Sequence, residues 1–279
     1  MATTSIEWAT HVWNPTTGCD RISAGCDNCY ALTMAKRLKG MGSAKYQNDG
    51  DPRTSGPGFG LTIHPDTLED PFTWTKPRTV FVNSMSDLFH ARVPLDFVRR
   101  VFEVIEATPQ HTYQVLTKRA SRLPRVADKL PWPENLWMGV SIESADELHR
   151  ADSLRRVPAA VRFLSCEPLL GPLGEVDLAG IHWLIAGGES GPGARPMHPD
   201  WARSLRDQCV NAGVAFHFKQ WGAFRWVAGD RWDAATQCWV DNGIVPQRVP
   251  KKLSGRELDG RTWDELPASA LASTVAGGA

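Results

Sequence analysis

The fold is decided by the stretch Thr79-Val-Phe-Val-Asn-Ser-Met-Ser-Asp-Leu-Phe-His90 and by the two elements that come after it in the chain. Its first residues are apolar and β-branched, which predicts a strand, and the polar residues after them predict a loop. Residues 95–107 then have apolar side chains at helical spacing, and residues 112–116 predict the next strand. A strand, a helix and a second strand in this order predict a parallel sheet with right-handed crossovers.

The same alternation continues along the chain. Further strands are predicted at residues 136–142, 161–165, 182–186 and 214–218, and further helices at residues 120–130, 145–156 and 201–212. That makes six strands between residues 79 and 218, and an additional early strand is expected within residues 6–13. The predicted fold class is therefore α/β, a partial (β/α) TIM-like barrel with a C-terminal extension.

Two segments do not share this alternation. Residues 40–78 contain many Gly, Pro, Asp, Asn and Ser residues and predict a long insertion within a barrel domain that spans residues 1–222. Residues 223–267 contain Trp and Arg and predict a C-terminal cap or extension. Residues 268–279 are small and weakly polar, which predicts a disordered tail.

The composition limits the classes of function. Thirty-one basic and thirty-one acidic residues give zero formal net charge, so no overall charge favours a dedicated nucleic-acid or membrane-surface binder. No run of about 18 apolar residues predicts a membrane span. The first residues lack the basic and apolar segments of a signal peptide, so we expect a cytoplasmic protein. Clustered cysteines in that reducing compartment indicate metal or iron–sulfur ligation rather than disulfides.

Three of the six cysteines lie in one short loop, Gly18-Cys-Asp-Arg-Ile-Ser-Ala-Gly-Cys-Asp-Asn-Cys-Tyr30, with the spacing C-x6-C-x2-C. Thiolates at Cys19, Cys26 and Cys29 can converge on a zinc ion, which needs a fourth ligand, or on a [4Fe–4S] cluster with one open iron. A helix predicted directly after Cys29 would direct its backbone N–H groups at the negative charge of such a centre. Unliganded core cysteines are the remaining alternative.

Polar residues come directly after the predicted strands at six places. Because the carboxyl ends of parallel strands meet at one edge, these residues predict a lined pocket, although a single one is ordinarily a turn or cap residue. They are Ser84, Ser86 and Asp87; Thr117, Lys118 and Arg119; Ser141 and Glu143; Cys166 and Glu167; Gly187, Gly188 and Glu189; and Lys219 and Gln220.

The strand at residues 161–165 allows two orientations, because its side chains alternate between two faces. Either Phe163 and Glu167 point into the barrel, or Leu164 and Cys166 do. We favour an inward Glu167, since Arg162 is an unfavourable interior residue, and we expect Glu167 to bind a hydroxyl or ammonium group of the substrate or of a small-molecule cofactor. Cys166 is the alternative catalytic candidate as a hydrogen-atom donor, although a free cysteine is ordinarily a buried small apolar residue.

A resemblance covers nearly the whole chain, from about residue 5 to residue 267. The chain resembles the radical S-adenosylmethionine (SAM) enzymes and, more closely, the phage Gp37/Gp68 family (DUF5131), which is radical-SAM-like. The matching stretches are Ile6-Glu-Trp, Trp13-Asn-Pro-Thr-Thr-Gly-Cys19, Gly25-Cys-Asp-Asn-Cys-Tyr30, Ser84-Met-Ser-Asp-Leu-Phe89, Leu116-Thr-Lys-Arg119, Phe163-Leu-Ser-Cys-Glu-Pro-Leu-Leu170, Gly187-Gly-Glu-Ser-Gly-Pro192 and Phe218-Lys-Gln-Trp-Gly222. The chain departs from most radical SAM enzymes by three extra residues between Cys19 and Cys26.

The resemblance implies a [4Fe–4S] cluster on the three cysteines and reductive cleavage of SAM to a 5′-deoxyadenosyl radical. It implies SAM contacts from Ser84, Ser86, Asp87, Lys118, Ser141, Glu143, Gly187, Gly188 and Glu189. It also implies a reducing electron donor as partner, and a nucleic acid or nucleotide is the first candidate for the substrate. The alternatives left open are a zinc- or cluster-binding accessory protein of a phage or host complex, and a sugar- or phosphate-handling barrel with a structural cluster.

Overall fold

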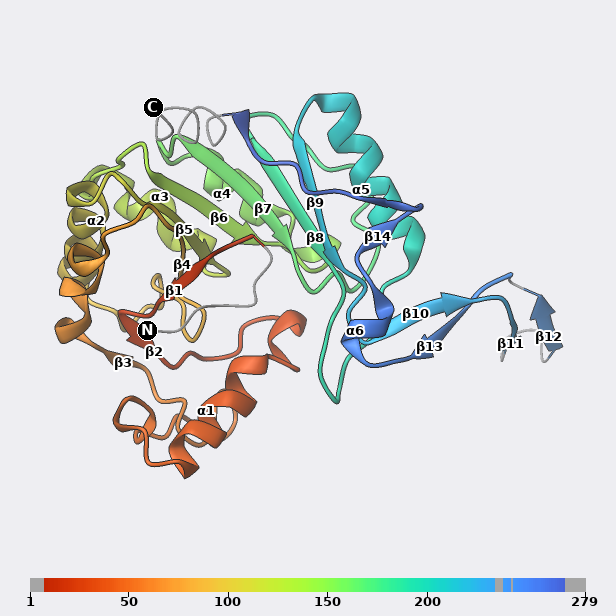
Figure 1. Cartoon of the computed structure of the whole chain (residues 1–279), viewed down its shortest axis with the longest axis horizontal. Helices are drawn as coiled ribbons and strands as arrows, with labels where there is room; N and C mark the ends of the chain where they lie inside the picture. Colours follow the sequence, from red (N-terminus) through yellow and green to blue (C-terminus); the bar gives the residue numbers. More distant parts are fainter. Residues whose placement is uncertain (1–7, 234–237, 242, 269–279) are drawn as a thin grey trace.

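The structure is a computed structural model that describes residues 8–233, 238–241 and 243–268. Its centre is a sheet of seven parallel strands whose spatial order is also their chain order (Figure 1). They are β1 (His11–Trp13), β4 (Thr79–Val82), β5 (Thr112–Thr117), β6 (Leu136–Ser141), β7 (Val161–Cys166), β8 (Trp183–Gly187) and β9 (Ala215–Gln220). The sheet is curled into a half-barrel, which confirms the predicted partial barrel with one early strand and six later ones.

Helices follow β4, β5, β6 and β8 and cover the outer face of the sheet (Figure 1). They are α2 (Leu95–Ala107), α3 (Leu123–Val126), α4 (His149–Arg155) and α5 (Pro199–Ala212). The helix predicted over residues 120–130 is divided into two 3-10 turns and the short α3, because Pro124 favours the first turn of a new helix. Helix α1 (Tyr30–Gly40) lies apart from these four. The short α6 (Lys251–Ser254) belongs to the C-terminal segment that follows the sheet.

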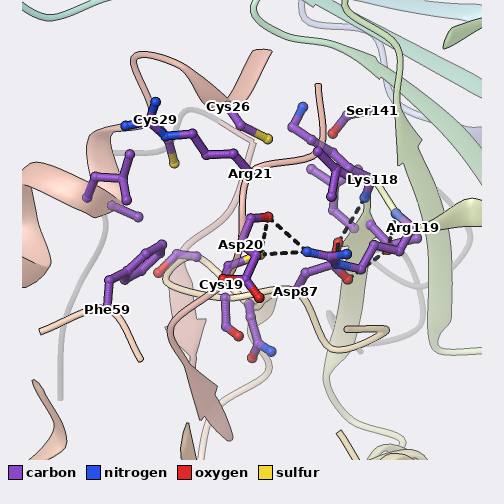
Figure 2. A pocket seen from close by; sticks show the side chains of 18 of the residues that line it. Cys19, Asp20, Arg21, Cys26, Cys29, Phe59, Asp87, Lys118, Arg119 and Ser141 are labelled. Carbon is purple, nitrogen blue, oxygen red and sulfur yellow. Dashed lines mark hydrogen bonds and ion pairs between the residues drawn. The ribbon is translucent and has the colours of Figure 1, made fainter. Parts of the chain in front are cut away.

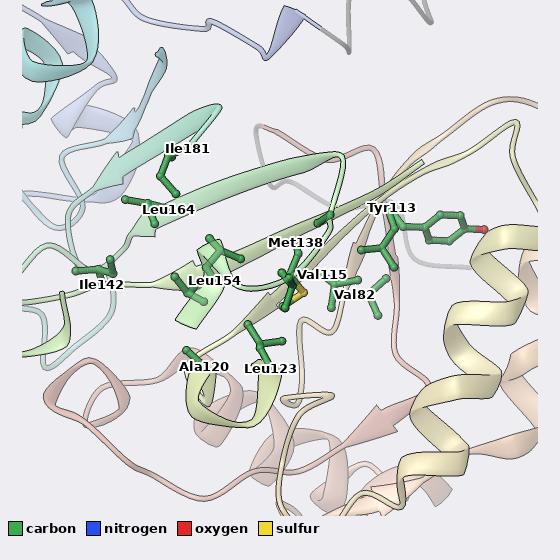
Figure 3. Close-up of a cluster of buried hydrophobic side chains, with 14 of the residues drawn as sticks. Val82, Tyr113, Val115, Ala120, Leu123, Met138, Ile142, Leu154, Leu164 and Ile181 are labelled. Carbon is green, nitrogen blue, oxygen red and sulfur yellow. The ribbon is translucent and has the colours of Figure 1, made fainter. Parts of the chain in front are cut away.

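The outer face of the sheet forms the main core. Val82, Val115, Met138 and Leu164 alternate onto this face and pack with helix residues such as Leu123 (Figure 3). All five are less than 2% exposed. Burial of these apolar side chains therefore holds the helices on the sheet.

Aromatic side chains fill part of the interior face. The Phe163 ring lies over Gly139, where a Cβ atom would be only 2.3 Å from the ring. Trp183 packs edge-to-face on Trp137 and on Trp8, with ring centroids 6.0 and 6.4 Å apart. These rings form a floor inside the half-barrel, and the cavity described below opens at the carboxyl ends of the strands.

The segments outside the alternation form small ribbons. In the insertion, β3 (Thr62–Ile63) pairs with β2 (Thr16–Thr17). The C-terminal segment contains three two-stranded pairs, β10 (Phe224–Val227) with β13 (Val245–Arg248), β11 (Asp230–Asp233) with β12 (Cys238–Asp241), and β14 (Glu257–Leu258) with β15 (Arg261–Thr262). Its end runs along β9, where the Phe218 N–H donates to the Trp263 carbonyl at 2.9 Å. That contact occupies an otherwise open sheet edge.

The predicted tail lies outside the described residues from residue 269 onward. Within the part of the chain that is described, no helix has the length and apolar character needed to cross a membrane.

A Gly139→Ala substitution tests the aromatic floor. We expect the added methyl group to push the Phe163 ring aside and to lower the free energy of unfolding by about 1–3 kcal/mol, as overpacking does. Urea denaturation measures the change. Gly171→Ala is the matched control, because a Cβ there meets no atom within 4 Å, and its effect should stay within about 0.5 kcal/mol. Equal effects of the two substitutions would contradict this account of the floor.

Candidate functional site

A cavity opens at the carboxyl ends of β4, β5 and β6, beneath the loop that carries the three cysteines (Figure 2). Cys19, Cys26 and Cys29 all line it. The cavity is largely apolar, and Phe81 and Leu116 contribute to its wall. Seven further residues predicted from the strand ends also line it, namely Ser84, Ser86, Asp87, Thr117, Lys118, Arg119 and Ser141.

The cysteine loop begins at a close contact with the end of β4. The Gly18 N–H donates to the Met85 carbonyl at 2.9 Å, and the Ser86 hydroxyl donates to the Gly18 carbonyl at 2.6 Å. Gly18 has a φ of +80°, and a Cβ atom there would lie 2.3 Å from the Gly60 carbonyl oxygen. Only glycine therefore suits this position, and Ser86 supports the loop besides facing the cavity.

The three sulfurs share the cavity but do not form a ready metal site. Cys26 ends a 3-10 turn. Cys29 immediately precedes α1, which confirms the helix predicted directly after it. Cys19 Sγ accepts a hydrogen bond from Arg119 Nη2 at 3.7 Å (Figure 2). Burial raises the pKa of Cys19 to about 12 and raises the pKa of Cys29.

A cysteine loop that follows a strand and precedes a helix predicts that the three sulfurs converge at the carboxyl ends of the strands even without a metal, and the described part of the chain does not show such a group. Among the described residues, no group of three or more His, Cys, Asp or Glu side chains is arranged to hold a metal ion. Burial raises the pKa values of Cys19 and Cys29 and keeps these thiols neutral, whereas a metal site needs thiolates. The donor type and the common cavity nevertheless fit a cluster with three protein ligands.

Asp20, directly after Cys19, ties the loop to the insertion and to the end of β4. Its carboxylate accepts hydrogen bonds from Thr54 Oγ1 at 2.8 Å, His90 Nε2 at 2.9 Å and Arg92 Nη2 at 3.1 Å. Burial would raise the pKa of Asp20, but the hydrogen bonds from Thr54 and His90 and the nearby positive charges lower it. The carboxylate thus stays charged and holds the loop.

Glu143 lies under the loop and is fully buried. Its carboxylate accepts hydrogen bonds from the Ser23 hydroxyl, from Arg150 Nη1 at 2.8 Å and from Lys118 Nζ at 3.4 Å. A Cβ atom at Gly25 would come within 2.8 Å of this carboxylate. Burial would raise the pKa of Glu143, but Lys118, Arg150 and Ser23 lower it. Both oxygens are bound by the chain itself, so Glu143 anchors the loop.

Asp87 joins the ends of β4 and β5. It accepts hydrogen bonds from Thr117 Oγ1 at 2.7 Å and from the Lys118 N–H at 3.0 Å. Ser84 is bound in a similar way, because its N–H donates to Asn14 Oδ1 at 2.9 Å. These two predicted binding residues border the cavity while they hold its wall together.

The end of β7 places its two candidates on opposite faces. Val161 and Phe163 face the interior, so Glu167 lies on that side, where Lys219 Nζ is 3.1 Å from Glu167 Oε1. Cys166 is fully buried in the outer core with Leu164. Neither Cys166 nor Glu167 lines the cysteine cavity.

Gly187, Gly188 and Glu189 also lie outside the lining of this cavity. The backbone of Trp221 passes so close to Gly188 that a Cβ atom there would lie 2.2 Å from the Trp221 carbonyl oxygen. The Glu189 carboxylate is bound by Arg195 and by Asn28 of the cysteine loop. The glycines therefore permit close backbone approach, and Glu189 connects β8 to the loop.

The sequence did not reveal the partners of these acidic anchors. They are Ser23, Asn28, His90, Arg150 and Arg195. Asp27 and Asn28 could have indicated such partners, because polar residues between two cysteines can be bound by side chains from elsewhere in the fold.

Together these features define a parallel half-barrel protein with a cavity lined by three thiols at the carboxyl ends of its strands. A family model described as "Protein of unknown function (DUF5131)" matches residues 3–267, and the chain belongs to this family. No curated protein matches the chain.

Similar solved structures include forms of spore photoproduct lyase. One variant has a TM-score of 0.46 and 12% identity, covering 90% of this chain and 72% of that chain. The lyase complexed with dinucleoside spore photoproduct, and a variant with bound AdoMet and the dinucleoside, each have a TM-score of 0.44 and 12% identity, covering 83% of this chain and 68% of theirs. Proteins this distant need not share a chemistry.

A Glu143→Gln substitution tests the anchor. It leaves Lys118 and Arg150 facing an uncharged group, so we expect the free energy of unfolding at pH 7 to fall by about 3 kcal/mol. Because the pKa of Glu143 is lowered in the folded state, the difference from the wild type should be complete above the ordinary value of 4.5. It should shrink as the pH falls through the lower pKa of the folded protein.

Urea denaturation across this pH range measures both effects. Glu147→Gln is the matched control, because Glu147 binds the same Arg150 at 2.7 Å but is partly exposed, and its effect should be smaller. A difference that grows in acid would contradict the role of Glu143 as a buried charged anchor.

Proposed function

We propose that this chain is an iron–sulfur enzyme of the radical SAM type, close to the phage Gp37/Gp68 proteins it resembles. One observation carries the proposal: three cysteines of a single loop line one cavity at the carboxyl ends of a parallel half-barrel. In this kind of fold the strand ends and the loops after them carry the chemistry. Three thiolates suit a [4Fe–4S] cluster and leave one iron open for a small molecule.

Cys19, Cys26 and Cys29 would hold the cluster, which with SAM supplies reductive cleavage to a 5′-deoxyadenosyl radical. Around it, Arg119 donates toward Cys19 and offsets negative charge on the sulfurs. The start of α1 after Cys29 directs backbone N–H groups to the same place, and those of Ala31 and Leu32 act on the Cys29 thiol.

The cavity beside the thiols is the proposed SAM position. Ser84, Ser86, Lys118 and Ser141 supply polar groups at its border, while Phe81 and other apolar residues exclude water. Glu143 and Glu189 are proposed to act through the loop, because their oxygens are already bound by other side chains. Glu167, with Lys219, is proposed to contact polar groups of the substrate on the interior face.

A nucleic acid or nucleotide is the proposed substrate class, and a reducing protein is the proposed electron donor. Arg21 and Ile22 support the substrate class, because both line the cavity and both are exposed. A guanidinium group and an apolar side chain at one opening suit a phosphate and a base.

Anaerobic reconstitution with iron and sulfide tests the cluster. We expect about four irons per chain and a brown absorbance in the wild type. Cys19→Ser, Cys26→Ser and Cys29→Ser should each lose most of the iron, because each removes one of three ligands. Cys166→Ala is the matched control and should keep it, since Cys166 lies in the outer core.

The electron paramagnetic resonance spectrum of the reduced protein should change when SAM is added, and 5′-deoxyadenosine should form. A colourless protein that takes up zinc and no iron would overturn the proposal in favour of a zinc-binding accessory protein. A Cys166→Ala protein that cleaves SAM but cannot complete turnover would assign the hydrogen-donor role to that thiol in place of the Glu167 assignment.

A further inference from the structure

The two residues between Cys26 and Cys29 are both held by the loop after β8. Asn28 Nδ2 donates to the Gly193 carbonyl at 2.8 Å, and Asp27 Oδ2 lies 3.6 Å from Arg195 Nη1. The segment that spaces two of the thiols is therefore attached to a part of the chain more than 160 residues away in sequence.

Glu189 is the centre of this contact. Arg195 Nη2 donates to Glu189 Oε1 at 2.7 Å, and Arg195 Nε donates to Oε2 at 2.9 Å, which is the paired geometry of the strongest Arg–carboxylate contacts. The Arg195 N–H at 2.8 Å and Asn28 Nδ2 at 3.2 Å also donate to Oε2. Glu189 is only 5% exposed, so water competes little for these hydrogen bonds.

The same guanidinium group also reaches the residues before Cys26. Arg195 Nη2 donates to the Ala24 carbonyl at 2.8 Å. Packing is close as well, because a Cβ atom at Gly193 would lie 2.3 Å from Asn28 Oδ1. Arg195 thus binds the loop on both sides of Cys26, and Gly193 lets the β8 loop lie directly against it.

We propose that Glu189 and Arg195 are positioning residues that hold Cys26 and Cys29 at the cavity, with Gly193 permitting the contact. The purpose of this positioning, which is to present Cys26 and Cys29 as cluster ligands, rests on the proposed function. It gives the stretch Gly187-Gly-Glu-Ser-Gly-Pro192 a role other than contact with SAM.

Thiol alkylation of the metal-free protein tests the contact without any cluster. Iodoacetamide labelling and then peptide mass spectrometry give a separate rate for each cysteine. In Arg195→Gln we expect Cys26 and Cys29 to react about tenfold faster or more, because losing charged hydrogen bonds favours local opening of the loop. Cys19, which is held through Asp20, should keep its rate.

Three further variants separate positioning from a general loss of stability. Gly193→Ala should raise the same two rates by crowding Asn28, with no charge removed. Arg195→Lys keeps the charge but not the paired geometry, so its rates should fall between those of the wild type and Arg195→Gln. Arg203→Gln is the matched control, because Arg203 pairs with Asp200 and Asp259 away from the loop, and it should change neither rate.

Iron retention then links the contact to the cluster. In reconstituted protein, Arg195→Gln and Gly193→Ala should lose iron to a chelator about tenfold faster than the wild type, through the same local opening. Unchanged rates at Cys26 and Cys29 in both variants, or equal acceleration at Cys19, would overturn the positioning inference. A wild type that binds no iron while the alkylation rates change as expected would overturn the proposed function and leave the positioning of the thiols intact.

Discussion

The buried carboxylate of Glu143 is the contact on which the arrangement of the site depends. A charge taken out of water is very costly unless donors surround it, and here the donors come from three different parts of the chain. Ser23 belongs to the cysteine loop, Lys118 comes directly after β5, and Arg150 lies in α4. Satisfying one charge therefore requires the loop, the sheet and an outer helix to be in place together.

The half-barrel places this contact beside the cavity at the carboxyl ends of its strands. Phe163, Trp137 and Trp183 occupy the interior toward the amino-terminal ends of the strands, and the thiol-lined cavity lies toward the carboxyl ends. Acidic anchors then hold the cysteine loop over that opening at several points. Asp20 binds it to the insertion, Glu143 to the end of β6, and Glu189 to the loop after β8.

The sheet could be predicted from sequence because its signals are local. The apolar run at Thr79 and the helical spacing over residues 95–107 each report on their own segment, and both elements are present. Period-two alternation allowed two orientations for β7, and the unfavourable burial of Arg162 selected the one that the structure has. Local signals also predicted that Cys19, Cys26 and Cys29 share one site and that a helix begins directly after Cys29.

The roles of the acidic residues were harder to predict, because they depend on partners far away in sequence. Glu143 and Glu189 stand at strand ends like the other polar residues, and nothing near them in the chain indicates Ser23 or Asn28.

The six residues between Cys19 and Cys26 carry three attachments of the loop, the first of which joins Asp20 to Thr54 of the insertion. Ser23 reaches Glu143 after β6, while the Ala24 carbonyl meets Arg195 of the loop after β8. A loop with only three residues in this interval would have to place all three attachments on consecutive residues. The longer interval of this chain separates the attachment of Asp20 from those of Ser23 and Ala24. A graft of a shorter cysteine motif onto this half-barrel would therefore have to rebuild these supports.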